Sequence, residues 1–338
     1  MKFETFFLHP RLAENIAAAG YIIPTPIQTQ AIPKVMQGFD LMGLAQTGTG
    51  KTAAFVLPIL HRLLNDPGKG TRALIIAPTR ELAEQIHQAI ESLGNRTGIR
   101  SASVYGGVGM PPQVKALKRA DIVVACPGRL LDHIRQKTID LSRVEVLVLD
   151  EADQMFDMGF MPDIRRIIAT LPQSGRQTLL FSATMPVEIG RLADDILEKN
   201  RIRVEIEHEA PLETISHAFF PVSQHLKTSL LLRLLGNTGA ESVLVFTRTK
   251  HRAKQLCGKL AKAGFRSTSL QGNLSQSKRQ DAMNGFRNGK YQVLVATDIA
   301  SRGIDVAGIS HVINYDMPAT PEIYIHRIGR TGRAEHSG

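Results

Sequence analysis

Short aliphatic runs alternate with longer amphipathic stretches along this chain. In residues 1–207 the runs predict strands at 41–44, 73–77, 101–105, 121–126, 144–149 and 178–182. The stretches between them predict helices at 53–64, 80–93, 128–136, 163–170 and 187–196, after a short helix-bearing segment at 3–20. Aliphatic strands separated by helices are typical of a parallel sheet covered by helices on both faces, so we expect an α/β domain.

A second alternating series follows a break in the apolar pattern. Residues 208–216 include Pro211 and interrupt the pattern, so we place a linker there. Beyond it we predict strands at 217–222, 242–247, 291–297 and 311–315, with helices at 224–235, 251–263, 275–287 and 321–328. A length of 338 residues is enough for about two domains. We therefore expect one domain at 1–207 and a second, related domain at 217–338.

Charge is distributed unevenly between the two halves. Residues 1–207 contain 24 Lys and Arg against 22 Asp and Glu, whereas residues 208–338 contain 17 against 9. The net charge is +10, and most of the excess lies in the second half. A basic half favours a polyanion such as a nucleic acid as partner, although charge that serves solubility gives the same composition.

The rest of the composition indicates a soluble, cytoplasmic protein. Cys126 and Cys257 are far apart and lack metal-ligand spacing, which fits a reducing compartment without disulfides. Charged residues interrupt the N-terminal stretch, so we expect no signal peptide. No apolar run approaches the length of a membrane span, so we expect no membrane attachment.

Residues 45–52, AQTGTGKT, lie between a predicted strand and a predicted helix. Glycine tolerates a tight turn there, and the backbone N–H groups of 48–52 can point at an anion at the helix start. Lys51 then reaches the β- and γ-phosphates of a nucleotide, and the Thr52 hydroxyl suits Mg²⁺. The general phosphate-loop pattern begins with glycine, where this chain has Ala45. The sequence therefore predicts a nucleotide site of a variant type.

Carboxylates follow the strand predicted at 144–149. Asp150 lies where a nucleotide-bound Mg²⁺ needs a ligand, and Glu151 is placed to orient and deprotonate an attacking water. Ser182 and Thr184 end the next strand and are placed to sense these carboxylates. Without the phosphate loop, an acidic helix start stabilised by the helix dipole would be the simpler interpretation. With the loop, we favour a catalytic centre.

Three further strand-to-helix turns carry groups suited to phosphate contacts, namely Thr79-Arg80, Gly106-Gly107 and Pro127-Gly128-Arg129. They supply backbone N–H groups, a hydroxyl and guanidinium groups, which contact phosphates without reading bases. Taken singly, each is also an ordinary helix start. Ligands of parallel α/β sheets bind at the carboxyl ends of strands, and the common placement of these turns there favours a shared site.

The second half has no phosphate loop of its own, but its strand ends are polar. Arg248, Arg279 and Thr297 lie in turns that can face a ligand. The stretch 326–333, HRIGRTGR, places arginines three apart, where they can converge on one anion. The usual alternative is that such arginines are solvated surface residues. The presence of the other motifs in the same chain argues against this alternative.

A proline-fixed turn at 24–28, PTPIQ, presents one amide side chain near the N-terminus. An amide offers a donor and an acceptor together, which complements the Hoogsteen edge of adenine. From the residues alone, Gln28 is more simply a solvated residue at a helix start.

Together these motifs resemble those of the DEAD-box ATP-dependent RNA helicases. In chain order they are PTPIQ, AQTGTGKT, PTRELA, GG, PGR, DEAD, SAT, TDIASRGID and HRIGRTGR, and they span essentially the whole chain. The run VLVFTRTK at 243–250 resembles the bacterial RhlE-like subgroup. The resemblance implies two tandem RecA-like domains. It also implies RNA-stimulated ATP hydrolysis in the cleft between them, coupled to local unwinding of RNA duplexes or remodelling of RNA–protein complexes.

The resemblance assigns roles to individual residues. For catalysis it implies Lys51, Glu151, Arg330 and Arg333. For ATP it implies Gln28 as the adenine reader with Phe3 packed nearby, Asp305 near the ribose, and the loop residues Ala45, Gln46, Thr47, Gly48, Thr49, Gly50, Lys51 and Thr52. For Mg²⁺ it implies Thr52 and Asp150. For RNA it implies Thr79, Arg80, Gly106, Gly107, Pro127, Gly128, Arg129, Arg248, Arg279 and Thr297, and for coupling between the domains Ser182, Thr184, Asp153 and His326.

RNA is the implied partner, single-stranded and duplex, and we expect the protein to act as a monomer. Binding through the RNA backbone predicts weak sequence specificity and strong salt dependence. Two positions depart from the family pattern. Cys126 stands where the family usually has threonine, so we expect no hydroxyl contact there. Family members usually continue beyond the last motif, so we expect the second domain to be incomplete at Gly338.

Three alternatives stay open at this point. A DNA-translocating ATPase shares the phosphate loop, and the Gln28 turn and the DEAD tetrad argue against it. An RNA clamp that locks on RNA without unwinding it would carry the same residues. A small-molecule phosphotransferase would use the loop alone and would have no use for the arginines of the second domain.

Overall fold

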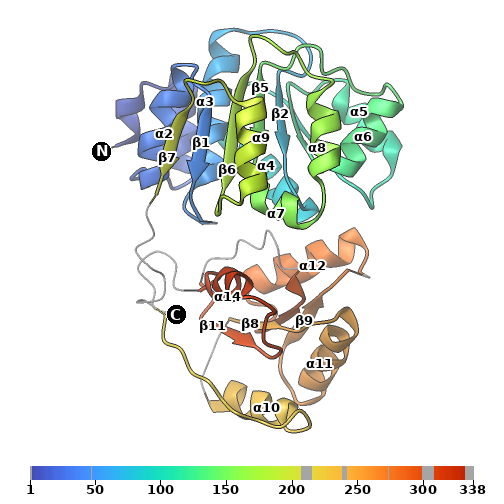
Figure 1. Ribbon diagram of the computed structural model, residues 1–338. Coiled ribbons are helices and arrows are strands. Elements are labelled where there is room, and N and C mark those ends of the chain that lie inside the picture. Colours follow the sequence, from blue (N-terminus) through green and yellow to red (C-terminus); the bar gives the residue numbers. More distant parts are fainter. Residues whose placement is uncertain are drawn as a thin grey trace. The chain divides into compact units, whose positions relative to one another are not determined.

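The computed structural model describes residues 2–46, 48–206, 215–237, 242–272, 274–298 and 308–331, without the side chains of Gln276, Glu322 and His326. The chain divides into two compact units, Met1–Glu207 and His208–Gly338 (Figure 1). Within the described ranges, no helix is long and apolar enough to cross a membrane.

The first unit is a seven-stranded parallel sheet with helices on both faces. Its strands are β1 (Leu41–Leu44), β2 (Ala73–Ile76), β3 (Ser101–Val104), β4 (Ile122–Ala125), β5 (Val146–Leu149), β6 (Gln177–Ser182) and β7 (Ile202–Glu205). Its helices are η1 (Phe3–Phe6), α1 (Pro10–Ala18), α2 (Pro26–Met36), α3 (Lys51–Asn65), α4 (Arg80–Leu93), α5 (Met110–Leu117), α6 (Pro127–Arg135), α7 (Ala152–Asp157), α8 (Met161–Ile168) and α9 (Val187–Ile196).

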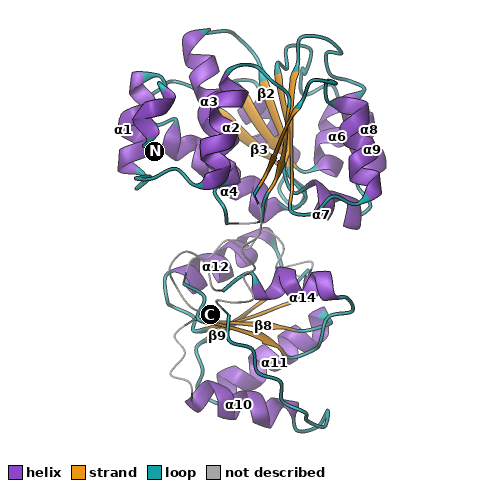
Figure 2. Ribbon diagram, turned by 60° about the vertical axis from the view of Figure 1, so that its left-hand side comes forward, coloured by secondary structure: helices purple, strands orange, loops and turns teal. Residues whose placement is uncertain are grey.

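Alternation along the strands builds two cores, one on each face of this sheet. In β2, Ile75 packs into the core shared with α1 to α4, while Leu74 and Ile76 pack into the other core. Figure 2 shows α1 to α4 on one side of the sheet and α6, α8 and α9 on the other. Strand β1, between β6 and β7, needs Gly43, because a Cβ atom there would lie 2.6 Å from the ring of Phe181 on β6. Both faces are therefore closely packed with apolar side chains.

The second unit repeats this plan with a four-stranded parallel sheet in the order β11-β8-β10-β9. The strands are β8 (Val243–Phe246), β9 (Ser267–Leu270), β10 (Val293–Ala296) and β11 (His311–Asn314). The helices are α10 (Lys227–Asn237), α11 (Lys250–Lys262), α12 (Gln276–Arg287) and α14 (Pro321–Ile328). Helices α10 and α11 cover one face of the sheet, and α12 covers the other.

The strand order of the first unit, β3-β4-β2-β5-β6-β1-β7, fixes where its loops meet. All of these strands are parallel, so every loop that follows a strand lies at one edge of the sheet. The loops after β1, β6 and β5 are neighbours and carry the phosphate loop, SAT and DEAD. The loops after β2, β4 and β3 continue the edge and carry PTRELA, PGR and GG.

One strand predicted from the sequence is wrong. Residues 217–222 form no strand, and Phe219 and Phe220 are 76% and 48% exposed. The pattern misled because the segment contains Pro221, which cannot donate to a ladder, and two consecutive aromatic residues where a half-buried strand would alternate. The predicted linker at 208–216 lies largely outside the described residues.

Some elements were not predicted. The turn at 24–28 opens the full helix α2, which tolerates Pro33 inside it, and α5 and α7 begin soon after loop motifs. The strands β7, IRVE, and β9, STSL, carry few aliphatic residues because each lies at the edge of its sheet and is half exposed.

Candidate active site

The phosphate loop joins the buried strand β1 to α3. Gly48 and Gly50 have φ angles of +87° and +91°, which non-glycine residues rarely adopt. A Cβ atom on Gly50 would also lie 2.4 Å from the Gln28 amide nitrogen, so no larger residue fits. Lys51 is buried and its Nζ donates to the Ala45 carbonyl at 2.8 Å, while Thr52 stands half-buried on the first turn of α3. The loop therefore presents a helix start with a lysine folded against it.

Gln28 connects the N-terminal turn to this loop. Its Oε1 accepts from the Thr25 backbone N–H at 3.0 Å, and its Nε2 donates to the Gly50 carbonyl at 3.1 Å. The side chain is 1% exposed, so the simpler expectation of a solvated residue is wrong, although its place at a helix start is confirmed. Phe3 is buried and packs edge-to-face on Phe6 and Tyr21, with ring centroids 5.7 and 5.9 Å away.

Asp150 and Glu151 follow β5 and are both about 2% exposed. Burial raises the pKa of Asp150 to about 7, partly offset by Lys51, and the neighbouring Glu151 raises it further. Glu151 has a φ angle of +55°, and its N–H donates to Asp150 Oδ1 at 3.0 Å. A non-glycine residue in this region is strained, and such strain persists where the surroundings hold it for function. The pair is a buried acidic centre beside a lysine.

Asp153 locks the DEAD segment to the SAT segment. Its Oδ2 accepts from the N–H groups of Ala183 and Thr184 at 3.1 and 2.9 Å and from the Thr184 hydroxyl at 3.1 Å. Its own N–H donates to Ser182 Oγ at 3.2 Å, and that hydroxyl donates to the Thr184 carbonyl at 2.7 Å. The loops after β5 and β6 are thus tied into one unit.

Four of the predicted phosphate-contacting residues gather on the other half of the edge. A Cβ atom on Gly107, whose φ is +85°, would lie 2.2 Å from an Arg80 nitrogen. At Gly106 it would lie 3.3 Å from an Arg80 nitrogen and 4.0 Å from an Arg129 nitrogen. Thr79 is buried and caps α4, with its hydroxyl accepting from the Leu82 N–H. Two guanidinium groups therefore converge on a glycine turn, where an anion would relieve their mutual repulsion.

Cys126 precedes Pro127, the first residue of α6, and makes no side-chain cap for that helix. Burial raises the pKa of its thiol to about 12, so it stays neutral and behaves as a small apolar group. Gly128 is exposed on the first turn of α6, and a Cβ atom there would meet no other group within 4 Å.

The predicted residues of the second unit have different surroundings. Arg248 is exposed and its N–H donates to Asp316 at 3.0 Å, and Thr297 is half-buried after β10. Arg279 is buried, with a guanidinium nitrogen 3.4 Å from the Gln271 carbonyl, and Arg330 is buried as well. Thr47, Asp305, Arg333 and the His326 side chain lie outside the described part of the chain.

Arg327, the first arginine of HRIGRTGR, holds the second unit together, a role that the sequence analysis did not predict. Its guanidinium binds both oxygens of Asp298 at 2.6 and 2.8 Å and donates to Asn314 Oδ1 and the Asp316 carbonyl, each at 2.7 Å. It also stacks 4.8 Å above the Phe246 ring. The available signal was an acid two residues after a buried strand, Asp298 after β10.

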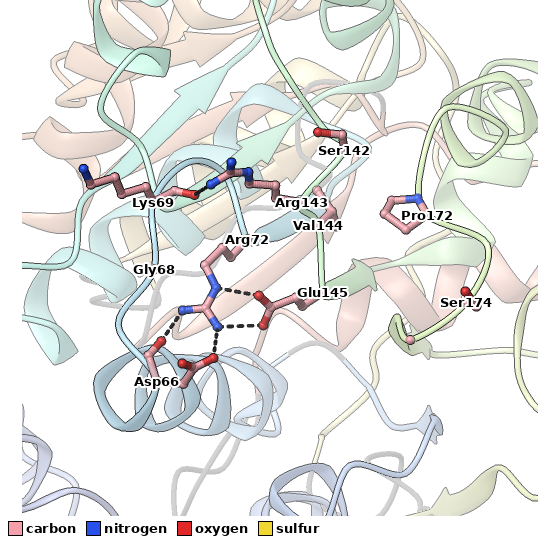
Figure 3. A pocket seen from close by; sticks show the side chains of 11 residues that line it. Asp66, Gly68, Lys69, Arg72, Ser142, Arg143, Val144, Glu145, Pro172 and Ser174 are labelled. Atoms are coloured by element: carbon pink, nitrogen blue, oxygen red, sulfur yellow. Dashed lines mark hydrogen bonds and ion pairs between the residues drawn. The ribbon is translucent and has the colours of Figure 1, made fainter.

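A pocket of about 350 Å³ lies elsewhere on the first unit and contains none of the predicted residues. It is lined by the segments before β2, β5 and β6, and Figure 3 shows Arg72 at its wall between Asp66 and Glu145. The guanidinium is 2.6 and 2.8 Å from the two Glu145 oxygens and 2.8 Å from Asp66 Oδ2. These charges satisfy one another, so the pocket is not a candidate active site.

Comparison with known families gives two matches that follow the two units. Residues 25–192 match the DEAD/DEAH box helicase model, and residues 226–335 match the helicase conserved C-terminal domain. The ATP-dependent RNA helicase CshA of Listeria monocytogenes is 44% identical over 339 residues, which cover 100% of this chain and 65% of that protein. RhpA, a DEAD-box ATP-dependent RNA helicase of Helicobacter pylori, is 45% identical over 99% of this chain and 68% of its own length. The chain thus spans about two thirds of these relatives.

Solved structures give the same result. Dbp5 of S. cerevisiae bound to RNA and ADP BeF3 matches with a TM-score of 0.88 and 33% identity, over 98% of this chain and 86% of that one. A DEAD box protein of Methanococcus jannaschii matches with a TM-score of 0.60 and 39% identity, over 99% of this chain and 90% of its own. The expected fold of two tandem RecA-like α/β domains is confirmed. By sequence and by structure, the chain belongs to the family of DEAD-box ATP-dependent RNA helicases.

Proposed function

We propose that this protein is an RNA-stimulated ATPase that unwinds RNA duplexes locally or remodels RNA–protein complexes. The observation that carries the proposal is the arrangement of one sheet edge. The nucleotide motifs after β1, β6 and β5 adjoin the glycine and arginine turns after β2, β4 and β3. The names of the relatives CshA and RhpA and the RNA-bound Dbp5 structure support it.

ATP is the proposed substrate, with its phosphates on the loop 45–52 and its adenine at Gln28. Lys51 neutralises developing charge on the phosphates, and Glu151 accepts the proton of the attacking water. Arg330 and Arg333 act on the γ-phosphate from the second unit, and Asp305 binds the ribose. The lysine's present contact with the Ala45 carbonyl is one that a bound nucleotide would replace.

Mg²⁺ is the proposed metal, held by Asp150 and Thr52. A hard cation prefers carboxylate and hydroxyl oxygens and takes few protein ligands when phosphates supply the others. The residues fit, because burial leaves the Asp150 carboxyl with a raised pKa that a nearby cation would lower. When bound, the ion neutralises charge on the β- and γ-phosphate oxygens.

RNA is proposed to bind through its backbone to Thr79, Arg80, Gly106, Gly107 and the PGR turn Pro127–Arg129 in the first unit. In the second unit, Arg248, Thr297 and the buried Arg279 are proposed for the same role. Coupling between the domains is proposed to use the hydrogen bonds that join Asp153 to Ser182 and Thr184. The side chain of His326 is proposed to take part in the same coupling.

Finer assignments complete the proposal. The run VLVFTRTK at 243–250 supports membership of the RhlE-like subgroup. We place the protein in the cytoplasm, because its proposed substrate RNA is found there, and we propose that it acts as a monomer.

The decisive experiment is the ATPase rate without nucleic acid, with single-stranded RNA and with the same sequence as DNA, at two salt concentrations. Stimulation by RNA alone that fades with salt is expected. Equal stimulation by DNA contradicts the proposal and favours a DNA-translocating ATPase. Release of a labelled RNA strand under multiple turnover separates a helicase from an RNA clamp.

Lys51→Ala is the matching variant. It removes the cation that contacts the phosphates, so RNA-stimulated hydrolysis should fall by about 10²-fold or more. Hydrolysis at the wild-type rate would remove Lys51 from this role.

A further inference from the structure

Gln113, on α5, lies beneath the glycine turn 105–109 and has no role in the proposals above. The side chain is 6% exposed. Its Nε2 lies 3.2 Å from the Tyr105 carbonyl and 3.3 Å from each of the Val108 and Gly109 carbonyls. The nitrogen of a single neutral amide thus lies within hydrogen-bond distance of three backbone carbonyls of one short turn.

Arg129 reinforces this arrangement from the side. Its NH1 donates to the Val108 carbonyl at 2.7 Å, and its Nε lies 3.7 Å from Asp132. Carbonyls drawn inward leave the opposite side of the turn to N–H groups. Among the described residues, no protein group accepts from the N–H of Gly106 or Gly107. Adjacent N–H groups of this kind form a concave anion site, and the guanidinium groups of Arg80 and Arg129 lie beside it.

We propose that Gln113 is a positioning residue for RNA binding: by holding the carbonyls of the turn inward, it aims the Gly106 and Gly107 N–H groups at an RNA phosphate. The inference rests on the proposed function and adds a residue to its RNA site. A donor is required at this position, because the groups it meets are all acceptors. Methionine has a similar length and no donor, and glutamate would set a carboxylate against three carbonyls.

The test measures RNA-stimulated ATPase of the full chain carrying Gln113→Met or Gln113→Glu. The RNA concentration for half-maximal stimulation should rise about 5–20-fold in the methionine variant and further in the glutamate variant. The rate at saturating RNA and the ATP dependence without RNA should stay within about twofold, since α5 holds no nucleotide residue. Gln88→Met, at an exposed position of α4, is the matched control and should behave as wild type.

Salt dependence separates positioning from charge. Arg129→Met removes a cation and should reduce the slope of log affinity against log salt, whereas Gln113→Met should weaken binding with the slope unchanged. A reduced slope for Gln113→Met would overturn a positioning role. The positioning role would also be overturned if Gln113→Met retained the wild-type melting temperature and needed the same RNA concentration as wild type for half-maximal stimulation.

Hydrogen exchange without RNA measures how firmly the turn 105–109 is held, and this measurement does not depend on the proposed function. Faster exchange of segment 105–109 in Gln113→Met is expected, and unchanged exchange overturns the clamp. A wild-type protein that RNA does not stimulate would defeat the proposed function, while the exchange experiment would still decide whether Gln113 holds the turn.

Discussion

The two edges of the first unit's sheet use charge in opposite ways. At the amino edge, Arg72 meets Glu145 and Asp66, and each charge has an opposite partner (Figure 3). At the carboxyl edge, Asp150 and Glu151 are buried side by side, and burial outweighs Lys51 in setting the pKa of Asp150. Charges at the amino edge therefore stabilise the fold. Those at the carboxyl edge lower its stability, which is consistent with the nucleotide site proposed there.

The largest effect should come from Glu151→Gln at the carboxyl edge. The substitution keeps the shape of the side chain and removes the proton acceptor, so RNA-stimulated turnover should fall by about 10²–10⁴-fold. ATP and RNA binding should persist, as measured by fluorescence anisotropy of labelled ligands. Glu14→Gln, at an exposed position of α1, is the control. Unchanged turnover would exclude Glu151 as the base.

A substitution at the amino edge should change the stability of the protein and leave its ATPase turnover unchanged. Arg72→Met leaves Glu145 and Asp66 without their cation and should lower the free energy of unfolding by about 2–4 kcal/mol, less than for a fully buried pair because both carboxylates reach solvent. Turnover of the folded variant should match wild type. Calorimetry alongside ATPase assays measures both, with Arg119→Met as an exposed control. A loss of turnover at full folding would contradict the comparison.

Asp150→Asn, at the carboxyl edge, should raise the stability of the ligand-free protein, whereas Arg72→Met lowers it. The folded pKa of Asp150 is raised from 3.8 to about 7, so the folded state holds a proton that the unfolded state releases between these values. Stability therefore falls as pH rises through this window. Asparagine removes the titration, so at pH above 7 the variant should be more stable by about 1–3 kcal/mol and its melting temperature should vary less with pH. Hydrolysis should be lost. A melting temperature below wild type at every pH would refute this account.

The smallest effect is expected at Cys126, which precedes α6 with extended backbone and makes no side-chain cap. Cys126→Thr supplies a hydroxyl for an N–H of the first turn and should stabilise the first unit by about 0.5–1 kcal/mol. Turnover at saturating RNA should be unchanged. Chemical unfolding measures the gain, and Cys126→Ala, which adds no acceptor, should show none.

The sequence predicted the elements with strong local signals. The helices α4, α9 and α14 begin and end as predicted, because Thr79 and Thr320 cap two of them and the apolar period is regular. The strands β7 and β9 were not predicted, because edge position and exposure depend on neighbours distant in the chain. The false strand at 217–222 has a local cause, since Pro221 and two consecutive aromatic residues do not suit a half-buried strand.

The candidate site was predicted as residue types, and its geometry was not. A phosphate loop and an acid after a buried strand are local patterns, so the sequence alone was enough to propose Lys51 and Asp150. No local pattern indicates the partners of several hydrogen-bonding side chains. Examples are the bonds of Gln28 to Gly50, of Arg327 to Asp298 and of Gln113 to the turn 105–109. Strand order, which divides the edge into two halves, likewise depends on pairing between distant segments.

That strand order has a consequence for how such proteins diversify. The turns after β2, β3 and β4 come from one uninterrupted stretch, residues 73–136, while β1 precedes it and β5 and β6 follow it. The residues proposed to bind nucleotide thus come from the flanking segments, and the residues of this unit proposed to bind RNA come from the single stretch between them. Under the proposed function, exchange of residues 73–136 between relatives would need only two junctions, at the loops before β2 and after α6, and would leave the proposed nucleotide residues in place.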